Sequence, residues 1–268
     1  MMVNFSKSLY SYLFDAADRL NRRNILGAIT TFARTVKSQA ILDIGCDDGR
    51  WTEKLVAAAA EGNSAQRIIR VVGIEIFEKQ AQLAETRGIQ VYRADVSNGL
   101  PCESSSFDIV HANQVIEHLP QIDIFVSEIL RVLKPNGLMI ISSENASAWH
   151  NIFAAVMGWQ IFSLTNVSDR VGALGNPFAL HRGTDAFASS WTHKTIFNYQ
   201  GFKELFEVHG FQDVTVMGAG YHPLPPIFGK LDPRHAHFIT AIGRKPISSI
   251  YNNEISSSKI EKISGYIE

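Results

Sequence analysis

Short apolar runs alternate with longer stretches of helical periodicity through the middle of the chain, and this alternation restricts the possible folds more than any other feature. Parallel strands need crossover segments, usually helices, and helices on both faces of a sheet leave its strands almost continuously apolar. The sequence therefore predicts βαβ units, a parallel sheet and an α/β fold. Five runs predict strands: AILDI (40–44), RVVGIE (70–75), IQVYRAD (89–95), FDIVHAN (107–113) and LMIISS (138–143).

The helix before the run at 138–143 has a recognisable end. Its apolar face runs from Ile122 to Leu133 at three- and four-residue steps. We expect it to stop at Lys134–Gly137 (KPNG), because proline cannot continue helical hydrogen bonding and Asn-Gly accepts the positive φ of a turn. The chain should then pass directly into the strand at 138.

The two ends of the chain differ in pattern from this central region. Residues 6–36 carry apolar side chains near helical spacing in two segments, which predicts leading helices packed beside the sheet. The last residues are rich in Ser and Asn, which predicts loose order. We therefore divide the chain into an N-terminal helical segment (1–38), an α/β domain (39–244) and a loosely ordered tail (245–268).

The second half of the α/β domain begins irregularly. Residues at about 144–191 show no clear strand pattern and are rich in aromatic residues and glycine, so we interpret them as an insertion over the active edge of the sheet. A helix is predicted at about 198–209, with Asn198 as its cap and Gly210 as its stop. The last two strands are predicted near 211–217 and 236–243.

Charge and cysteine content exclude several classes of protein. Lys and Arg total 25 against 26 Asp and Glu, which gives a net charge of -1. No block of like charge is long enough to follow a phosphate backbone, so nucleic acid is not an expected partner. Cys46 and Cys102 are too few for a disulfide framework and lack metal-ligand spacing. We therefore expect a reducing, cytoplasmic location.

Membrane insertion is not expected either. Charges interrupt residues 1–25, so the start does not have the pattern of a secretory signal. The longest apolar stretch, 152–164, is shorter than the about 20 residues that cross a bilayer. That stretch could still lie on a membrane surface, and peripheral membrane contact is therefore kept as an alternative.

The segment ILDIGCDDG (41–49) predicts a buried strand that runs into a glycine-bearing turn and then a helix. Gly45 and Gly49 would let a ligand approach the backbone, because no Cβ stands in the way. Taken alone, this could be a purely structural turn. Glu75 ends the next strand, about one βα unit later, where a carboxylate can accept hydrogen bonds from both hydroxyls of a ribose. Together the two features favour a nucleoside ligand.

A dinucleotide-dependent dehydrogenase uses the same βαβ arrangement and is the first rival. It needs the pattern G-x-G-x-x-G with a pyrophosphate at a helix N-terminus. The three glycine positions are occupied here by Gly45, Asp47 and Arg50, and the acids at 47 and 48 would repel a pyrophosphate. A positively charged sulfonium donor would not be repelled.

Several motifs together resemble the class I S-adenosylmethionine-dependent methyltransferases of the type 11 group. They are LDIGCDDG, the acid that ends the second strand, Asp95-Val96, FDIVHANQVIEHL and LRVLKPNGLMIIS. The resemblance covers roughly residues 38–145 and more faintly 192–243. It implies a three-layer α/β sandwich, a Rossmann-like methyltransferase fold with a seven-stranded, mostly parallel sheet and an antiparallel last strand. It also implies S-adenosyl-L-methionine as cofactor and methyl transfer to a small-molecule acceptor.

The resemblance assigns donor-binding roles to particular residues. The loop after the first strand would contact the methionine moiety. Glu75 would bind ribose, with Ile76 beside the adenine. After the third strand, Asp95 and the backbone of Val96 would meet the adenine amine. The family usually has glycine where this chain has Asp47. The implied donor-binding residues are Asp43, Gly45, Asp47, Gly49, Glu75, Ile76, Asp95, Val96 and Asn113.

His118 is the candidate general base, because histidine can accept the acceptor's proton near neutral pH. The alternative is that the Glu117-His118 segment only starts and packs a helix. Metal binding through this pair, as resembling quinone-pathway O-methyltransferases suggest, is not expected, because Gln114 stands where a further acid would help. Other candidate bases are His150, His181, His193 and His222.

Two further alternatives stay open at this point. The chain could be a non-catalytic methyltransferase-fold scaffold, or a membrane-surface methyltransferase for a lipid or quinone. The aromatic residues of the insertion could form core under a lid or could clamp an apolar, ring-shaped acceptor. The sequence indicates neither the identity of the acceptor nor an oligomeric state.

Overall fold

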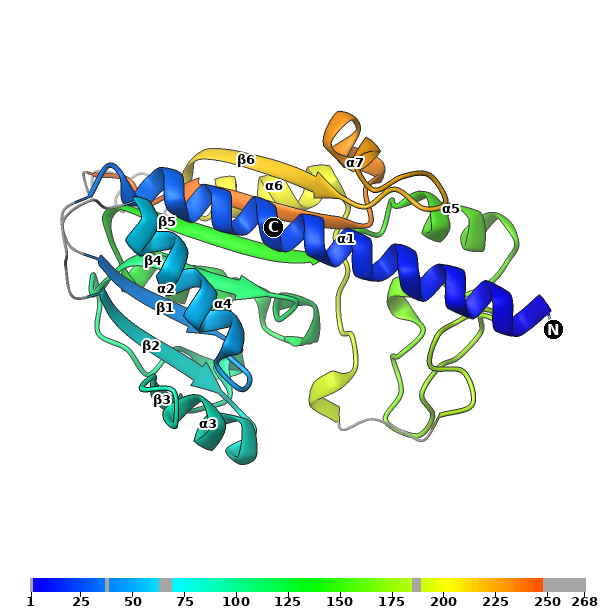
Figure 1. The fold of residues 1–268 in the computed structure, drawn as a ribbon, viewed down its shortest axis with the longest axis horizontal. Coiled ribbons are helices and arrows are strands. Elements are labelled where there is room, and N and C mark those ends of the chain that lie inside the picture. Colours follow the sequence, from blue (N-terminus) through cyan, green and yellow to red (C-terminus); the bar gives the residue numbers. More distant parts are fainter. Residues whose placement is uncertain (1, 37–38, 63–68, 185–188, 248–268) are drawn as a thin grey trace, which may run out of the picture.

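The computed structural model describes residues 2–36, 39–62, 69–184 and 189–247 (Figure 1). Among these residues, seven strands form one sheet in the order β3-β2-β1-β4-β5-β7-β6. The strands are β1 (Gln39–Ile44), β2 (Ile69–Glu75), β3 (Gln90–Arg93), β4 (Phe107–Asn113), β5 (Leu133–Glu144), β6 (Gln212–Ala219) and β7 (Phe238–Arg244). The helices are α1 (Met2–Ala33), α2 (Arg50–Gly62), α3 (Glu78–Glu85), α4 (Ile122–Val132), α5 (Trp149–Val156), α6 (Tyr199–Val208) and α7 (Phe228–Leu231).

The pairing of the strands confirms the predicted fold class. The strands β3, β2, β1, β4 and β5 run parallel to one another. The last strand in the sequence, β7, is antiparallel to both β5 and β6. Because the parallel strands share one direction, their carboxyl ends lie at one edge of the sheet. The order of connections reverses beside β1, where α/β proteins of this kind bind ligands.

Helices cover both faces of the sheet and make three layers. Alternate residues of β1 enter different cores, since successive side chains of a strand point to opposite faces. Ile41 packs with Ile25 of α1 and Leu55 of α2, whereas Leu42 belongs to the core that contains Phe125 of α4 and α6 residues. This burial on both faces explains why the strands read as apolar runs.

The N-terminal segment is one helix, which corrects the prediction of two leading segments. The helix α1 continues for 32 residues without a break. The apolar pattern is interrupted at Asn21, but this side chain is 1% exposed. Its amide donates to Ser142 Oγ at 2.8 Å and its carbonyl accepts from Thr240 Oγ1 at 2.6 Å. The interruption is therefore a polar anchor on the sheet, and not a boundary between helices.

The predicted turn at Lys134–Gly137 is also different in the structure. The helix α4 ends at Val132, and β5 already begins at Leu133. The register between β4 and β5 shifts between Phe107 and Ile109, so the KPNG segment is accommodated as an irregularity within the strand. Asn136 takes the positive φ of 61° that its residue type tolerates.

The region around α6 follows the prediction closely. Asn198 caps α6, and its side-chain oxygen accepts from the backbone N–H of Gly201 at 2.8 Å. Gly210 follows the helix with a φ of +92°, which a side chain would disfavour. The chain then enters β6 at Gln212.

Residues 145–184 and 189–191, which follow β5, contain α5 and short helical turns, and an isolated bridge joins Asn145 to Phe197. Figure 1 shows this region beyond the carboxyl ends of the parallel strands.

In the described part of the chain, no helix is long and apolar enough to cross a membrane. Of the tail predicted at 245–268, residues 248–268 lie outside the described residues.

Candidate active site

The turn between β1 and α2 is fixed against the end of β2. The backbone N–H groups of Gly45 and Cys46 donate to the carbonyl of Ile74 at 2.8 and 3.1 Å. Gly45 and Gly49 have φ values of +72° and +80°, and a Cβ on Gly49 would lie 2.6 Å from Ile89 Cδ1. Both glycines are thus required by backbone conformation, and Gly49 also by the close approach of α3 and its flanking residues.

Asp47 takes the place that glycine usually has in the resembling family, and it keeps a glycine-like conformation. Its φ is 47°, a left-handed value that Asp adopts more readily than most side chains. Its backbone N–H donates to Glu75 Oε2 at 3.0 Å. The substitution therefore changes the charge of the turn but preserves the positive φ.

Glu75 joins two loops at the sheet edge. While Oε2 accepts from Asp47, Oε1 accepts from the backbone N–H of Phe77 at 2.9 Å. The carboxylate is 7% exposed. Each carboxylate oxygen has a second lone pair, so the group can accept further hydrogen bonds from a ligand. Glu75 is therefore held in place and retains acceptor capacity.

Asp43, which the resemblance assigns to the donor-binding loop, has its side chain inside the protein. The residue is 1% exposed. One carboxylate oxygen accepts from Thr52 Oγ1 at 2.6 Å, and the other lies 2.7 Å from His111 Nδ1. Thr52 is in the first turn of α2 and His111 is in β4, so Asp43 fastens the start of α2 to the sheet and thereby positions the glycine turn.

Sequence reasoning missed His111. It lies buried in β4, within the otherwise mostly apolar run FDIVHAN. A histidine in such a run was the sequence feature that could have identified it. The indole Nε1 of Trp51 lies 3.5 Å from His111 Nε2, and Arg22 of α1 stacks over the same indole at 4.7 Å. This network links α1, α2, β1 and β4 behind the turn.

The residues that follow β2 and β3 lie at the same edge as Glu75. The side chain of Ile76 is 46% exposed, so its apolar surface is open to contact with an adenine ring. Phe77 is 6.3 Å from the ring of Trp191, so the end of the insertion reaches the β2 side of the edge. Asp95 caps the short helix Val96–Asn98, with Oδ1 accepting from the Ser97 N–H at 2.9 Å, and its side chain is exposed.

Asn113 ends β4 and is contacted by α1. Its side-chain oxygen accepts from Asn21 Nδ2 at 3.1 Å. The same Asn21 bonds to Ser142 and Thr240, so the long helix is tied to β4, β5 and β7 at once. Asn21 was not predicted as a site residue, because only the tertiary structure brings it to this edge.

Glu117, His118 and His193 form a cluster after β4. The Nδ1 of His118 lies 3.3 Å from the carbonyl oxygen of Thr192, and His193 Nδ1 lies 2.6 Å from the carbonyl of Ser163. A carbonyl can only accept, so Nδ1 carries the proton in both rings, and Nε2 carries the lone pair when the ring is neutral. The two ring centroids are 4.8 Å apart.

Burial controls the protonation of this cluster. It raises the pKa of the Glu117 carboxyl to about 8, although a hydrogen bond from Ser143 Oγ opposes the shift. It lowers the pKa of His118 to about 4, with a further contribution from His193. Both side chains are therefore mostly uncharged at neutral pH. His118 can accept a proton throughout the neutral range, as a weaker base than an ordinary histidine.

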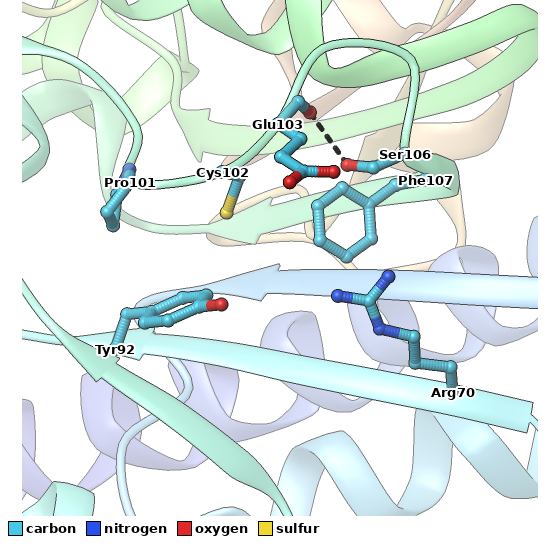
Figure 2. A pocket seen from close by; sticks show the side chains of 7 residues that line it. All are labelled: Arg70, Tyr92, Pro101, Cys102, Glu103, Ser106 and Phe107. Atoms are coloured by element: carbon cyan, nitrogen blue, oxygen red, sulfur yellow. Dashed lines mark hydrogen bonds between the residues drawn. The ribbon is translucent and has the colours of Figure 1, made fainter.

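A hollow of about 330 Å³ lies away from these residues, at the end of the sheet where β2 and β4 begin (Figure 2). In Figure 2 the guanidinium of Arg70 points toward the ring of Phe107, 5.5 Å from its centroid. The hollow is remote from Gly45 and Glu75, and it contains none of the predicted site residues. We therefore place the active site at the carboxyl edge, where these residues gather.

Comparison with known proteins identifies the family of this chain. A family model described as a methyltransferase domain matches residues 16–216. A ubiquinone biosynthesis O-methyltransferase of Bartonella bacilliformis is 33% identical and aligns over 76% of this chain and 72% of its own length. One of Sinorhizobium fredii is 28% identical, over 70% of this chain and 75% of its own. A possible histamine N-methyltransferase from Thermotoga maritima shares the fold, with a TM-score of 0.55 and 17% identity over 88% of this chain and 94% of that one.

The chain belongs to the methyltransferase-domain family. It is an S-adenosylmethionine-dependent methyltransferase, and S-adenosyl-L-methionine is its cofactor. The alternative of a dinucleotide-dependent dehydrogenase is wrong. The acid-bearing turn at 45–49 and Glu75 fit a donor that combines a positive sulfonium with ribose hydroxyls, because those groups attract carboxylates whereas a pyrophosphate would be repelled.

Proposed function

We propose that this methyltransferase acts on a hydroxyl oxygen of an apolar, ring-shaped acceptor of the quinone-precursor type. The observation that carries the proposal is the similarity to two proteins named ubiquinone biosynthesis O-methyltransferase, which extends over most of both chains. The aromatic insertion supports it, since Trp149, Phe153 and Phe178 expose large parts of their rings. Such rings suit an acceptor that is itself apolar and planar.

The donor is held by the turn at 45–49 and the loops after β2 and β3. We assign the methionine moiety to the backbone around Gly45, Asp47 and Gly49, and the ribose hydroxyls to Glu75. Ile76 packs on the adenine, while Asp95 and the backbone of Val96 meet its amine. Asn113 lines the donor site from β4. These assignments follow from the position of each residue at the carboxyl edge and from the family resemblance.

When bound in this site, S-adenosyl-L-methionine would supply its sulfonium methyl group to the acceptor oxygen and leave as the neutral thioether. The protein's part is to align the acceptor and to exclude water, because in-line displacement at a methyl carbon needs little other assistance. Trp191, whose ring lies 6.3 Å from that of Phe77, contributes to excluding water at the donor side. Glu75 contributes by holding both bordering loops in one geometry.

The acceptor hydroxyl must lose its proton, and we assign this proton to Nε2 of His118. The hydrogen bond from Nδ1 to Thr192 fixes the ring and its tautomer. His193, on the segment that returns from the insertion, packs against the ring edge and restricts it further. The resulting base is neutral at physiological pH and faces the region between β4 and the insertion.

Methyl transfer to oxygen is tested with labelled donor and matched acceptors. We expect label in an alkyl-substituted phenol, and none in the same ring with its hydroxyl already methylated, as measured by mass spectrometry. The equivalent aromatic amine should accept far less. Transfer to the amine and not to the phenol would contradict the proposal. Donor binding without transfer to any acceptor, including those in a cell extract, would favour the non-catalytic scaffold.

Removal of the Glu75 carboxylate should weaken donor binding. Glu75→Ala loses charge-assisted hydrogen bonds to ribose, so we expect a cost of about 1.5 to 3 kcal/mol in donor affinity. The matched control is Glu78→Ala, which removes an exposed acid three residues later that pairs with Arg93. Calorimetric titration with S-adenosylmethionine separates the two. Equal affinity of Glu75→Ala and wild type would refute the assignment.

Replacement of His118 should slow catalysis without weakening donor binding. We expect His118→Gln to reduce kcat by about 10² to 10⁴, the usual contribution of a general base. The control is His209→Gln, at the far end of α6. Because burial lowers the pKa of His118 to about 4, wild-type kcat should stay level between pH 7 and pH 6 and fall only as the pH approaches that value. An unchanged kcat in His118→Gln would remove His118 from the mechanism.

A further inference from the structure

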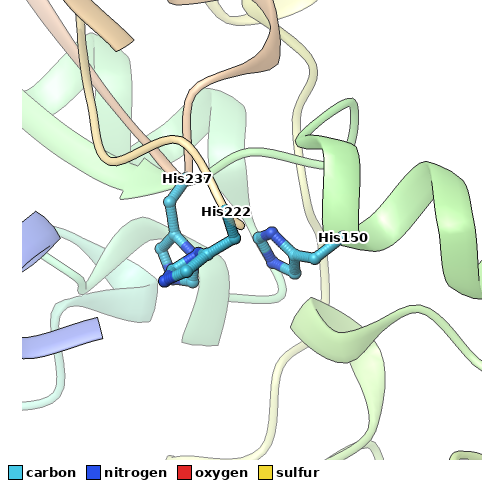
Figure 3. A group of neighbouring side chains, drawn as sticks. All are labelled: His150, His222 and His237. Atoms are coloured by element: carbon cyan, nitrogen blue, oxygen red, sulfur yellow. The ribbon is translucent and has the colours of Figure 1, made fainter. Parts of the chain in front are cut away.

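Three histidines from separate segments converge where β5 ends and β7 begins. His150 is in the first turn of α5, His222 follows β6, and His237 directly precedes β7 (Figure 3). One ring nitrogen of each lies within 4.8 Å of the other two. The backbone N–H of Asn145 donates to the carbonyl of His237 at 3.0 Å, which places the cluster at the same sheet edge as the active site.

The rings face one another closely. The Nδ1 atoms of His222 and His237 are 2.9 Å apart. His150 stacks on His237 with ring centroids 4.5 Å apart, and its ring is 5.3 Å from that of His222. A single hydrogen bond explains the first pair but gives no reason for a third imidazole at this distance. Figure 3 shows the rings of His222 and His237 overlapping, with the ring of His150 extending toward them from α5.

The surroundings of the cluster favour neutral imidazoles. His222 and His237 are 5% and 2% exposed, and Phe14, Phe162 and Phe238 pack their rings around the group. Imidazole binds a transition metal in its neutral form, which such apolar surroundings favour.

We propose that His150, His222 and His237 bind a divalent transition-metal ion of the Zn²⁺ class. Imidazole ligands suit Zn²⁺, Cu²⁺ and Ni²⁺ better than the oxygen-seeking Mg²⁺ and Ca²⁺. In a tetrahedral zinc site with Zn–N bonds of about 2.0–2.1 Å, ligand nitrogens are roughly 3.4 Å apart, and the ligand atoms of this cluster all lie within 4.8 Å of one another. Three protein ligands leave a fourth position for water or another small ligand.

The site is separate from the cluster after β4. Glu117, His118 and His193 also bring ligand atoms together, but with a carboxyl group and two rings whose Nδ1 atoms donate to carbonyls. The proposed metal site consists only of imidazoles and draws on α5 and the connection between β6 and β7. It rests on this convergence and not on the identity of the methyl acceptor.

The test is titration of the full-length, chelator-treated protein with Co²⁺, which reports tetrahedral coordination through its visible absorption. We expect one equivalent of Co²⁺ to bind and Zn²⁺ to displace it. Either His150→Gln or His222→Gln should reduce Co²⁺ affinity by at least about tenfold, since even loss of an outer-shell partner costs that much. His150 is half-buried, so this variant is the one expected to fold without difficulty.

Two controls make the outcome decisive. Far-UV circular dichroism and S-adenosylmethionine binding establish that each variant is folded. His118→Gln and His193→Gln should leave the Co²⁺ spectrum and affinity unchanged, because they alter only the other cluster. The proposal is overturned if folded wild-type protein binds no Co²⁺, or if binding survives in His150→Gln and His222→Gln and is lost in His118→Gln.

Discussion

The carboxylate of Glu75 accepts backbone hydrogen bonds from both loops that border the donor side of the sheet edge. One bond comes from Asp47 in the turn after β1, and the other comes from Phe77 after β2. Without this carboxylate, the turn after β1 would lose the hydrogen bond between the Asp47 N–H and the end of β2. We propose that the same group meets ribose, so that one residue both shapes the donor site and recognises the donor.

Two buried polar networks support this arrangement from behind. Asp43 joins Thr52 and His111, which fixes α2 to the sheet, and Asn21 joins α1 to β4, β5 and β7. Unsatisfied buried polar groups cost free energy, so each network favours a single arrangement of its members. The donor side is thus rigidly built. The proposed acceptor side consists of irregular segments that carry the aromatic rings and most of the clustered histidines.

The strands and the donor motif were predictable because they are local patterns: continuous apolar runs, glycines at positive φ, and an acid at the end of a strand. The Asn198 cap is local in the same way. The roles of Asn21, Asp43 and His111 were not predictable, since each depends on partners far away in the sequence. His237 was missed for the same reason, because it meets His150 and His222 only in the folded chain. Donor contact by individual residues, the domain limits and peripheral membrane contact stay predictions.

The central claim is that the donor lies between the 45–49 turn and the end of β2, with its sugar against Glu75. A crystal structure with bound S-adenosylhomocysteine, the demethylated donor, tests it most directly. The account predicts ribose hydroxyls within hydrogen-bond distance of the Glu75 carboxylate and the adenine between Ile76 and Asp95. A ligand found at the opposite end of the sheet, or a Glu75 carboxylate turned away from the sugar, would contradict it.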